Sequence, residues 1–188
     1  MKRVILGLGS NKSFEGKSCQ DLLGLACCDL AILLKNVIVS SVYKTKAMYV
    51  TNQDDFYNMV LMGFVAEDCN PFSLLEEIHK IEEKYGRDRK NEVRFGPRSL
   101  DIDIEFFGDD VINTPQLQIP HIRFEERAFV LIPMLELLQK SSDDLLKEKC
   151  EKCLASLKEK NETSDIEKVI SSSKFIFPRG GNYGTNGE

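Results

Sequence analysis

Residues 101–106 alternate strictly between acidic and apolar side chains. The acidic positions are Asp101, Asp103 and Glu105, and the apolar positions are Ile102, Ile104 and Phe106. Side chains two apart on a β-strand point to the same face, about 6–7 Å from each other, so the alternation predicts a half-buried strand. Two carboxylates at this spacing can bind hard divalent cations through their oxygens. The segment therefore predicts a metal-binding face on a sheet.

A loop rich in arginine leads directly into this strand. Its four guanidinium groups belong to Arg87, Arg89, Arg94 and Arg98. Guanidinium groups suit the oxygens of phosphates, and Gly96-Pro97 predicts a turn that orients Arg98 relative to the acidic pair. An ordinary edge strand with a solvated polar face is the alternative, but like charges on one face cost stability unless a cation offsets them. We expect metal-assisted transfer within a polyphosphate.

The length and charge of the chain limit its function. Its 188 residues allow one domain of ordinary size and a tail. The net charge of −5 argues against general binding to nucleic acids or membrane surfaces, which favours basic proteins. No stretch reaches the roughly 20 apolar residues of a membrane span. We therefore expect a cytoplasmic monomer that binds no nucleic acid and no membrane, and whose positive charge at residues 84–98 binds a small polyanion.

Two short motifs receive structural interpretations. Gly16-Lys17-Ser18 follows a predicted strand, but Asn11 replaces the leading glycine that a phosphate-binding P-loop requires. Cys150 and Cys153 form a C-x-x-C pair in a charged helical stretch, and no second Cys or His pair follows them. We expect packing residues there and not a zinc or redox site. The six cysteines lack the spacing of a disulfide framework, so we expect them to be reduced.

The order of predicted elements indicates the fold class. We predict strands at 4–8, 37–43, 56–65, 101–107, 111–112 and 117–119, and helices at 17–34, 71–84, 127–138 and 144–160. The leading elements follow the βαββαβ order of a split βαβ sandwich. We predict an α+β protein, a ferredoxin-like three-layer sandwich with a mainly antiparallel sheet and helices on both faces.

We predict two parts of the chain. Residues 1–140 form the catalytic domain, and residues 141–188 form a C-terminal helical extension. The Gly- and Asn-rich composition of residues 180–187 predicts a disordered end.

Several segments, in collinear order, resemble one enzyme family. They are Leu8 to Asn11, Ser40 to Thr45, Phe56 to Asn58, Gly86-Arg87, Arg94 to Asp103, Ile119 to His121 and Glu126 to Val130. Together they resemble the 6-hydroxymethyl-7,8-dihydropterin pyrophosphokinases of folate synthesis over about residues 1–140. The string from Phe95 to Asp103 is far more specific than an isolated D-x-D, whereas the tail contains no matching motif.

The resemblance implies transfer of the β,γ-diphosphate of ATP to the hydroxymethyl oxygen of a reduced pterin, with release of AMP. It implies that Asp101 and Asp103 hold two Mg²⁺ ions that bridge the triphosphate of the co-substrate ATP. The further catalytic residues would be Arg87, Arg89 and Arg98, the first two on a mobile loop that closes over ATP. The implied ATP-binding residues are Glu82, Arg87, Arg89, Arg98, Ile104, Gln118, His121 and Arg127.

For the pterin, the resemblance implies a ring sandwiched between Phe56 and Phe129. Its polar edge would bind Asn58 and backbone groups near Thr45. The residues favour this as well, because an aromatic side chain next to an amide on a strand suits a planar, amide-edged heterocycle. Each phenylalanine taken alone could equally be a core residue, but a buried Asn58 needs a hydrogen-bond partner.

Some positions depart from the family pattern. Lys46 to Val50 replaces a stretch that commonly contains proline and glycine, and Asp54 replaces a usual proline. The resemblance therefore does not predict the stiffness or the closure of this loop. Phe95 stands where a tryptophan is often found, which keeps an apolar lid but loses the indole donor. Glu105 stands where an apolar residue is frequent, and we expect it to be solvated.

The acidic strand and the length of the chain argue against two other classes of function. A ferredoxin-like RNA-binding module would need an exposed aromatic sheet face with basic flanks, and the acidic strand argues against it. A D-x-D nucleotide-sugar transferase usually needs a longer nucleotide-binding architecture than this chain provides.

Overall fold

The central layer of the molecule is a six-stranded sheet, shown in a computed structural model that describes residues 1–47, 52–89, 91, 96–139, 141 and 143–175. The strand order is β5–β1–β4–β3–β8, and β2 pairs with β4 beside this path. These pairings are all antiparallel. The strands are β1 (Lys2–Ser10), β2 (Lys35–Val39), β3 (Val42–Thr45), β4 (Phe56–Val65), β5 (Asp101–Phe107) and β8 (Ile166–Ile170). A separate short pair joins β6 (Ile112–Asn113) to β7 (Gln118–Ile119).

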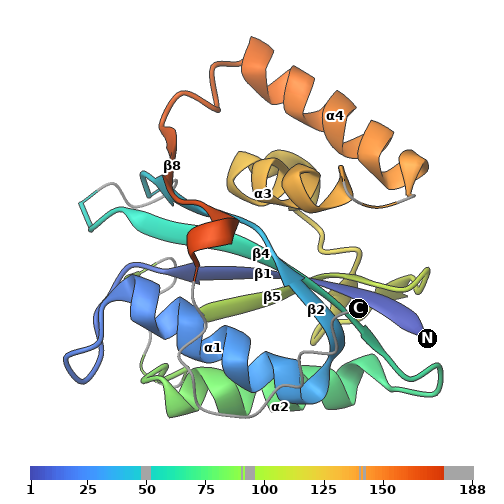
Figure 1. Cartoon of the computed structure of the whole chain (residues 1–188), viewed down its shortest axis with the longest axis horizontal. Helices are drawn as coiled ribbons and strands as arrows, with labels where there is room; N and C mark the ends of the chain where they lie inside the picture. Colours follow the sequence, from blue (N-terminus) through green and yellow to red (C-terminus); the bar gives the residue numbers. More distant parts are fainter. Residues whose placement is uncertain (48–51, 90, 92–95, 140, 142, 176–188) are drawn as a thin grey trace.

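Helices cover both faces of this sheet (Figure 1). On one face lie α1 (Cys19–Leu33) and α2 (Pro71–Lys84). On the other lies α3 (Ala128–Leu138), and α4 (Asp144–Glu159) packs on its outer side. The predicted α+β sandwich with a mainly antiparallel sheet is confirmed. Among the described residues, no helix combines the length and the apolar character that a membrane crossing requires.

The first two helices begin at capping residues. Ser18 is the N-cap of α1, and its hydroxyl and the carboxylate of Asp21 satisfy each other's backbone N–H groups in a capping box. Asn70 Oδ1 accepts a 2.8 Å hydrogen bond from the backbone N–H of Phe72, with Pro71 in the first turn of α2. The serine of the Gly16-Lys17-Ser18 motif therefore starts a helix.

The sheet separates two hydrophobic cores. Leu6, Leu22 and Ile78 belong to the core beneath α1 and α2, whereas Leu131 and Cys150 belong to the core beneath α3 and α4. The Sγ of Cys150 lies 3.7 Å from the Sδ of Met134, and burial raises the pKa of this thiol to about 12. All six cysteines are free. Cys150 lies in this core and Cys153 packs against it, as predicted for packing residues.

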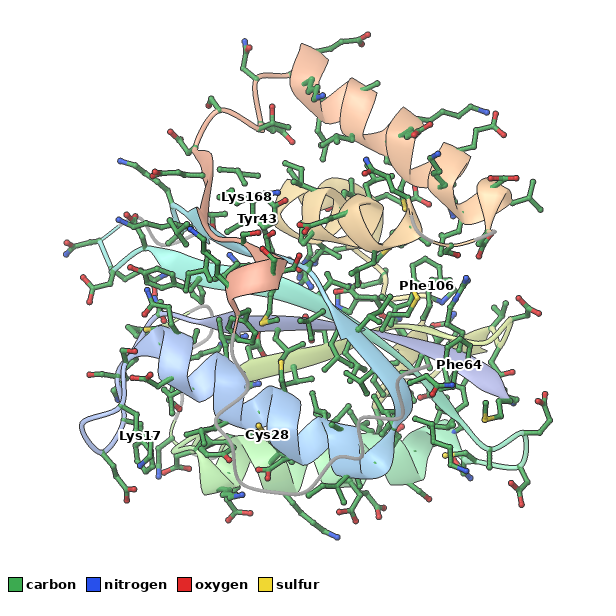
Figure 2. All side chains as sticks on the ribbon, in the orientation of Figure 1. Lys17, Cys28, Tyr43, Phe64, Phe106 and Lys168 are labelled. Atoms are coloured by element: carbon green, nitrogen blue, oxygen red, sulfur yellow. The ribbon has the colours of Figure 1, made fainter. Side chains whose placement is uncertain are left out.

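A β-bulge changes the predicted faces of β5. Ile5 pairs with Phe106, but the next residue of β1, Leu6, pairs with Ile104, so Glu105 is an extra residue in β5. Phe106 therefore turns to the α3 side of the sheet (Figure 2). There its ring centre lies 5.0 Å from that of Phe124 in an edge-on arrangement. The prediction that Phe106 shares a face with Ile104 is wrong, because the inserted residue reverses the alternation after it.

The segment after α4 contributes an unpredicted strand, β8, which pairs with β3. Lys168 of β8 lies over the ring of Tyr43 of β3, with Nζ 5.4 Å from the ring centre (Figure 2). Glu136 of α3 accepts hydrogen bonds from the hydroxyls of Ser41, at 2.8 Å, and Ser172, at 3.1 Å. Residues on both sides of position 140 thus share one sheet. The predicted disordered end at 180–187 lies outside the described residues.

Candidate active site

A cleft opens where β1, β3, β4 and β5 approach the start of α3 and the loop before β5. Most of the residues predicted to bind phosphate and pterin line it: Thr45, Phe56, Asn58, Arg87, Arg89, Arg98, Asp101, Asp103, Arg127 and Phe129. These residues come from segments far apart in the sequence. The antiparallel pairing of β5, β1 and β4 brings the acidic strand and the pterin-binding candidates into one cavity.

Asp101 lies between two guanidinium groups. Arg87 Nη1 donates to its Oδ1, and Arg98 Nη1 donates to its Oδ2. Burial alone would raise the pKa of Asp101, but the charges and hydrogen bonds of the two arginines outweigh it and lower the pKa. The carboxylate is therefore held ionised, as a metal ligand must be.

Asp103 is two residues further along the same face and binds a different arginine. Arg127 Nη1 donates to its Oδ2 at 2.7 Å, and His121 Nε2 lies 3.9 Å from the same oxygen. Burial lowers the pKa of His121, although the charge of Asp103 acts in the opposite direction. Asp103 retains one third of its side-chain exposure, so it faces the open part of the cleft.

Glu82 of α2 anchors the arginine-rich loop from below. Its carboxylate is fully buried and accepts hydrogen bonds from Arg87 and Arg89, and from the backbone N–H of Ile102 at 2.8 Å. Burial raises the pKa of Glu82, while the two arginine charges oppose this shift. Glu82 thus fixes the position of two arginines relative to β5, and it does so beneath the cleft.

Glu105 is fully buried, so the expectation of a solvated side chain is wrong. It lies in the cleft beside Gly7, on the same face of β5 as Asp103, and neither of its carboxyl oxygens has a hydrogen-bond partner. Burial, and then repulsion from Asp103, raises the pKa of Glu105 well above its usual range. The sequence signal for this residue was its acidic character at a frequently apolar position, but its burial depends on segments such as β1 that pack around it in the fold.

The other end of the cleft carries the aromatic and amide groups. Asn58 Nδ2 donates to Thr45 Oγ1 at 2.8 Å, and both residues are buried. Phe56 and Phe129 are partly buried and line the same cavity. The guanidinium carbon of Arg127 lies 5.7 Å from the ring centre of Phe129, which connects the aromatic end to the acidic strand. This arrangement suits a flat heterocycle beside a chain of phosphates.

Three further predicted ATP-binding residues lie elsewhere. The side chain of Ile104 packs in the core beneath α1 and α2, so only its main chain could contact a ligand. Gln118 lies on β7, where its Nε2 donates to Asn113 at 3.1 Å. His121 lies beside the cleft, with its Nε2 3.9 Å from Oδ2 of Asp103, which lines it.

Two departures from the family pattern lie wholly or partly outside the described residues. Phe95, the predicted apolar lid, lies outside the described residues, as does Arg94 of the cationic loop. Of the loop at 46–55, the structure describes residues 46–47 and 52–55, and Lys46 and Gln53 line the cleft.

The donor set of the cleft fits a hard divalent cation. Asp101 and Asp103 present carboxylate oxygens on one face of β5, and behind them Glu105 has two buried oxygens without a hydrogen-bond partner. Within the described part of the chain, no group of three His, Cys, Asp or Glu side chains forms a ready metal site. Two carboxylates match Mg²⁺, which usually takes its remaining ligands from water and substrate phosphates. Arg87, Arg98 and Arg127 would then turn from the carboxylates to the phosphates.

Comparison with known proteins identifies relatives of this chain. A family model described as 7,8-dihydro-6-hydroxymethylpterin-pyrophosphokinase (HPPK) matches residues 5–139. The 2-amino-4-hydroxy-6-hydroxymethyldihydropteridine pyrophosphokinase of Bacillus subtilis is 44% identical over 134 residues, which is 71% of this chain and 77% of that protein. The protein of the same name from Aquifex aeolicus is 39% identical over 137 residues, 73% of this chain and 81% of its own length.

Larger proteins contain a similar region. The folate synthesis bifunctional protein of Arabidopsis thaliana is 37% identical over 137 residues, but the chain spans only 27% of its length. The solved structure of wild-type Plasmodium falciparum HPPK-DHPS superposes with a TM-score of 0.61 at 15% identity, covering 89% of this chain and 47% of that one. This likeness supports the fold. The family match and the bacterial relatives together show that the chain belongs to the 7,8-dihydro-6-hydroxymethylpterin-pyrophosphokinase family.

Proposed function

We propose that the cleft transfers the diphosphate group of ATP to the hydroxymethyl oxygen of 6-hydroxymethyl-7,8-dihydropterin. As a member of its family, the chain is an ATP-dependent pyrophosphokinase of folate synthesis, with ATP and the pterin as substrates. One observation supports the assignment to this cleft most directly. The Asp101/Asp103 pair, four arginines and an aromatic end with a buried amide line a single cavity.

The pterin oxygen attacks the β-phosphorus in this reaction. A new oxygen–phosphorus bond forms, the bond from the α,β-bridging oxygen to the β-phosphorus breaks, and AMP leaves with the bridging oxygen. The hydroxyl proton of the pterin is released. Arg87, Arg89 and Arg98 offer donors to the phosphates, which makes them the proposed catalytic arginines.

Asp101 and Asp103 are the proposed ligands of two Mg²⁺ ions. Bound magnesium would neutralise charge on the triphosphate and orient it for in-line attack. The exchange of partners follows from the charges: when a cation binds the two carboxylates, their arginines become available to the phosphates. His121 and Arg127 would then contact the phosphates from the side of α3, while Glu82 holds Arg87 and Arg89 in place.

Phe56 and Phe129 are the proposed walls of the pterin site. Asn58 can offer its amide oxygen to a heterocycle edge while its amide nitrogen donates to Thr45. This hydrogen bond fixes the orientation of the amide before substrate arrives, which reduces the entropy lost on binding. Ile104 and Gln118 stay proposals for ATP contacts.

We also propose the organisation of the protein. Residues 1–140 would be the catalytic domain and 141–188 an extension that completes the sheet edge through β8. We propose a cytoplasmic monomer that does not bind nucleic acid, in keeping with the net charge of −5. The elution mass of the purified protein with static light scattering tests the monomer.

Product analysis tests the reaction. The protein is incubated with ATP, Mg²⁺ and the reduced pterin alcohol, and the nucleotides are separated by ion-exchange chromatography. AMP and the pterin diphosphate should appear in equal amounts. Formation of ADP without AMP would contradict diphosphoryl transfer and indicate an ordinary kinase.

A further inference from the structure

Arg127 has one strong partner in the cleft, and the proposed reaction requires that partner for another task. Its Nη1 donates to Asp103 at 2.7 Å, while its buried Nε has no hydrogen-bond partner. Only 16% of the Arg127 side chain is exposed. A buried guanidinium that loses its acceptor pays a desolvation cost, unless another acceptor is within reach. Magnesium binding to Asp103 would create this situation.

Glu105 lies where such an acceptor is needed. Its Oε1 is 3.9 Å from Arg127 Nη1, just beyond hydrogen-bond distance, and neither of its oxygens has a hydrogen-bond partner. Its other oxygen, Oε2, is 4.0 Å from His121 Nδ1. The carboxyl group is thus close to two phosphate-binding candidates but bonded to neither.

The backbone around Glu105 holds the carboxyl group in this position. The N–H of His121 donates to the carbonyl oxygen of Glu105 at 3.0 Å, which fixes the bulge against the segment before α3. A Cβ atom added at Gly7 would lie 2.8 Å from Glu105 Oε1, so the glycine leaves the space that the carboxyl group occupies. The placement is therefore built by three segments of the chain.

We propose that Glu105 is a positioning residue that takes over the guanidinium of Arg127 when Asp103 binds the divalent cation. A movement of about 1 Å would bring Nη1 into hydrogen-bond range of Oε1. One edge of the guanidinium then binds Glu105, and its other N–H groups face the phosphates. The inference rests on the proposed function, because it requires a cation at Asp103.

Nucleotide binding with and without magnesium tests this role. The probe is α,β-methylene-ATP, in which the bond broken in the reaction is replaced, and the measurement is its Kd by isothermal titration calorimetry. With Mg²⁺, Glu105→Met should weaken binding about 10-fold, the lower end of the usual effect of residues that orient metal-site groups. Without Mg²⁺, Arg127 keeps Asp103 as its partner, so the same variant should bind as the wild type does. Glu105→Gln retains an acceptor oxygen, so its Kd in the presence of Mg²⁺ should fall between those of the wild type and Glu105→Met.

A double-mutant cycle separates positioning from a purely structural role. In an Arg127→Met background, Glu105→Met should have no further effect on the magnesium-dependent Kd, because the residue it positions is absent. Glu136→Gln is the matched control, since it changes a partly buried carboxylate of α3 outside the cleft and should leave this Kd unchanged. A loss that is equal with and without Mg²⁺, or that persists in the Arg127→Met background, would overturn the inference.

The same titrations distinguish this inference from the proposed function. Asp103→Asn should abolish the magnesium dependence of the Kd. If it does not, the cation site at Asp103 is wrong and the takeover by Glu105 is wrong with it. If Asp103→Asn has the expected effect and both Glu105 variants bind as the wild type does, the inference fails and the proposed function stands.

Discussion

Two glutamates of this protein are equally buried and have opposite surroundings. Glu82 and Glu105 both have no exposed surface, and Glu105 is part of β5 while Glu82 accepts a hydrogen bond from it. The carboxylate of Glu82 accepts hydrogen bonds from two arginines and a backbone N–H. The carboxyl group of Glu105 accepts none.

The difference separates the part of the site that is already assembled from the part that changes when substrate binds. Burial raises the pKa of both glutamates, but arginine charges oppose the shift at Glu82, whereas Asp103 increases it at Glu105. Glu82 therefore contributes to the fold by fixing the arginine loop. Glu105 carries the cost of a buried carboxyl group without a hydrogen-bond partner, and an acceptor role toward Arg127 would relieve it.

Removing the satisfied glutamate should have the largest effect on stability. Glu82→Ala removes one of the two carboxylates that bind the buried Arg87 and leaves the Ile102 N–H without its acceptor, so the free energy of unfolding should fall by about 3 kcal/mol. Urea denaturation measures it. Glu83→Ala changes the exposed neighbour in α2 and should stay within about 0.5 kcal/mol of the wild type. A loss below about 1 kcal/mol at Glu82 would remove the contrast between the two glutamates.

The acidic strand should show its effect in turnover. Asp103→Ala should reduce the rate of AMP formation at least about 100-fold, because a preorganised charge contact is lost. Asp109→Ala alters an exposed carboxylate in the turn after β5 and is the control. Near-wild-type activity of Asp103→Ala would exclude this residue from the metal site.

A third carboxylate, Glu136, extends the comparison to a partnered group outside the cleft. It accepts hydrogen bonds from Ser41, Tyr43 and Ser172, which tie β3 and the segment after β8 to α3. Glu136→Gln should lower the free energy of unfolding by about 2 kcal/mol, in the range of hydrogen bonds to a charged group. No change in thermal or urea unfolding would show that these contacts do not hold the extension.

The pH dependence of the Glu136 effect follows from its pKa. Burial alone would raise this pKa, but the hydrogen bonds from Ser41, Tyr43 and Ser172 lower it below 4.5. A lowered pKa gives stability that is present above pH 4.5 and is lost as the pH falls through the folded-state value. The difference between wild type and Glu136→Gln should therefore shrink in acid.

The smallest change is expected at Glu105, and it has the opposite sign. Without metal, Glu105→Met replaces an unbonded buried carboxyl group with an apolar side chain and should raise the free energy of unfolding by about 1 kcal/mol at pH 7. The raised pKa of Glu105 gives the wild type stability that is present below pH 4.5 and is lost as the pH rises. The gain of Glu105→Met should accordingly grow from pH 4.5 upward. A gain that is constant with pH would contradict an unsatisfied carboxyl group.

Much of the site was predictable because its chemistry is local in sequence. The alternation at Asp101 and Asp103, the arginines before it and the pairing of Phe56 with Asn58 are each visible within a few residues. Caps such as Asn70 likewise act within one turn, so the start of α2 was predicted correctly. These features need no knowledge of distant neighbours.

The errors lie where distant segments meet. The bulge in β5 depends on the register with β1, and it moved Phe106 to the opposite core. Glu105, which we expected to be solvated, is buried beside Gly7 of β1. β8 was missed because residues 166–170 become a strand only by pairing with β3, more than 120 positions earlier in the chain.

The amino-acid sequence by itself indicated the family, most of the order of helices and strands up to residue 138, and the candidate residues for the chemistry. Tertiary structure alone decided the pairing of those residues. Asp101 binds Arg87 and Arg98, Asp103 binds Arg127, and Glu105 has no hydrogen-bond partner because sheet register and the bulge set distances across the cleft. Hydrogen bonds and desolvation depend on such distances within about 1 Å, and a one-dimensional pattern does not contain them.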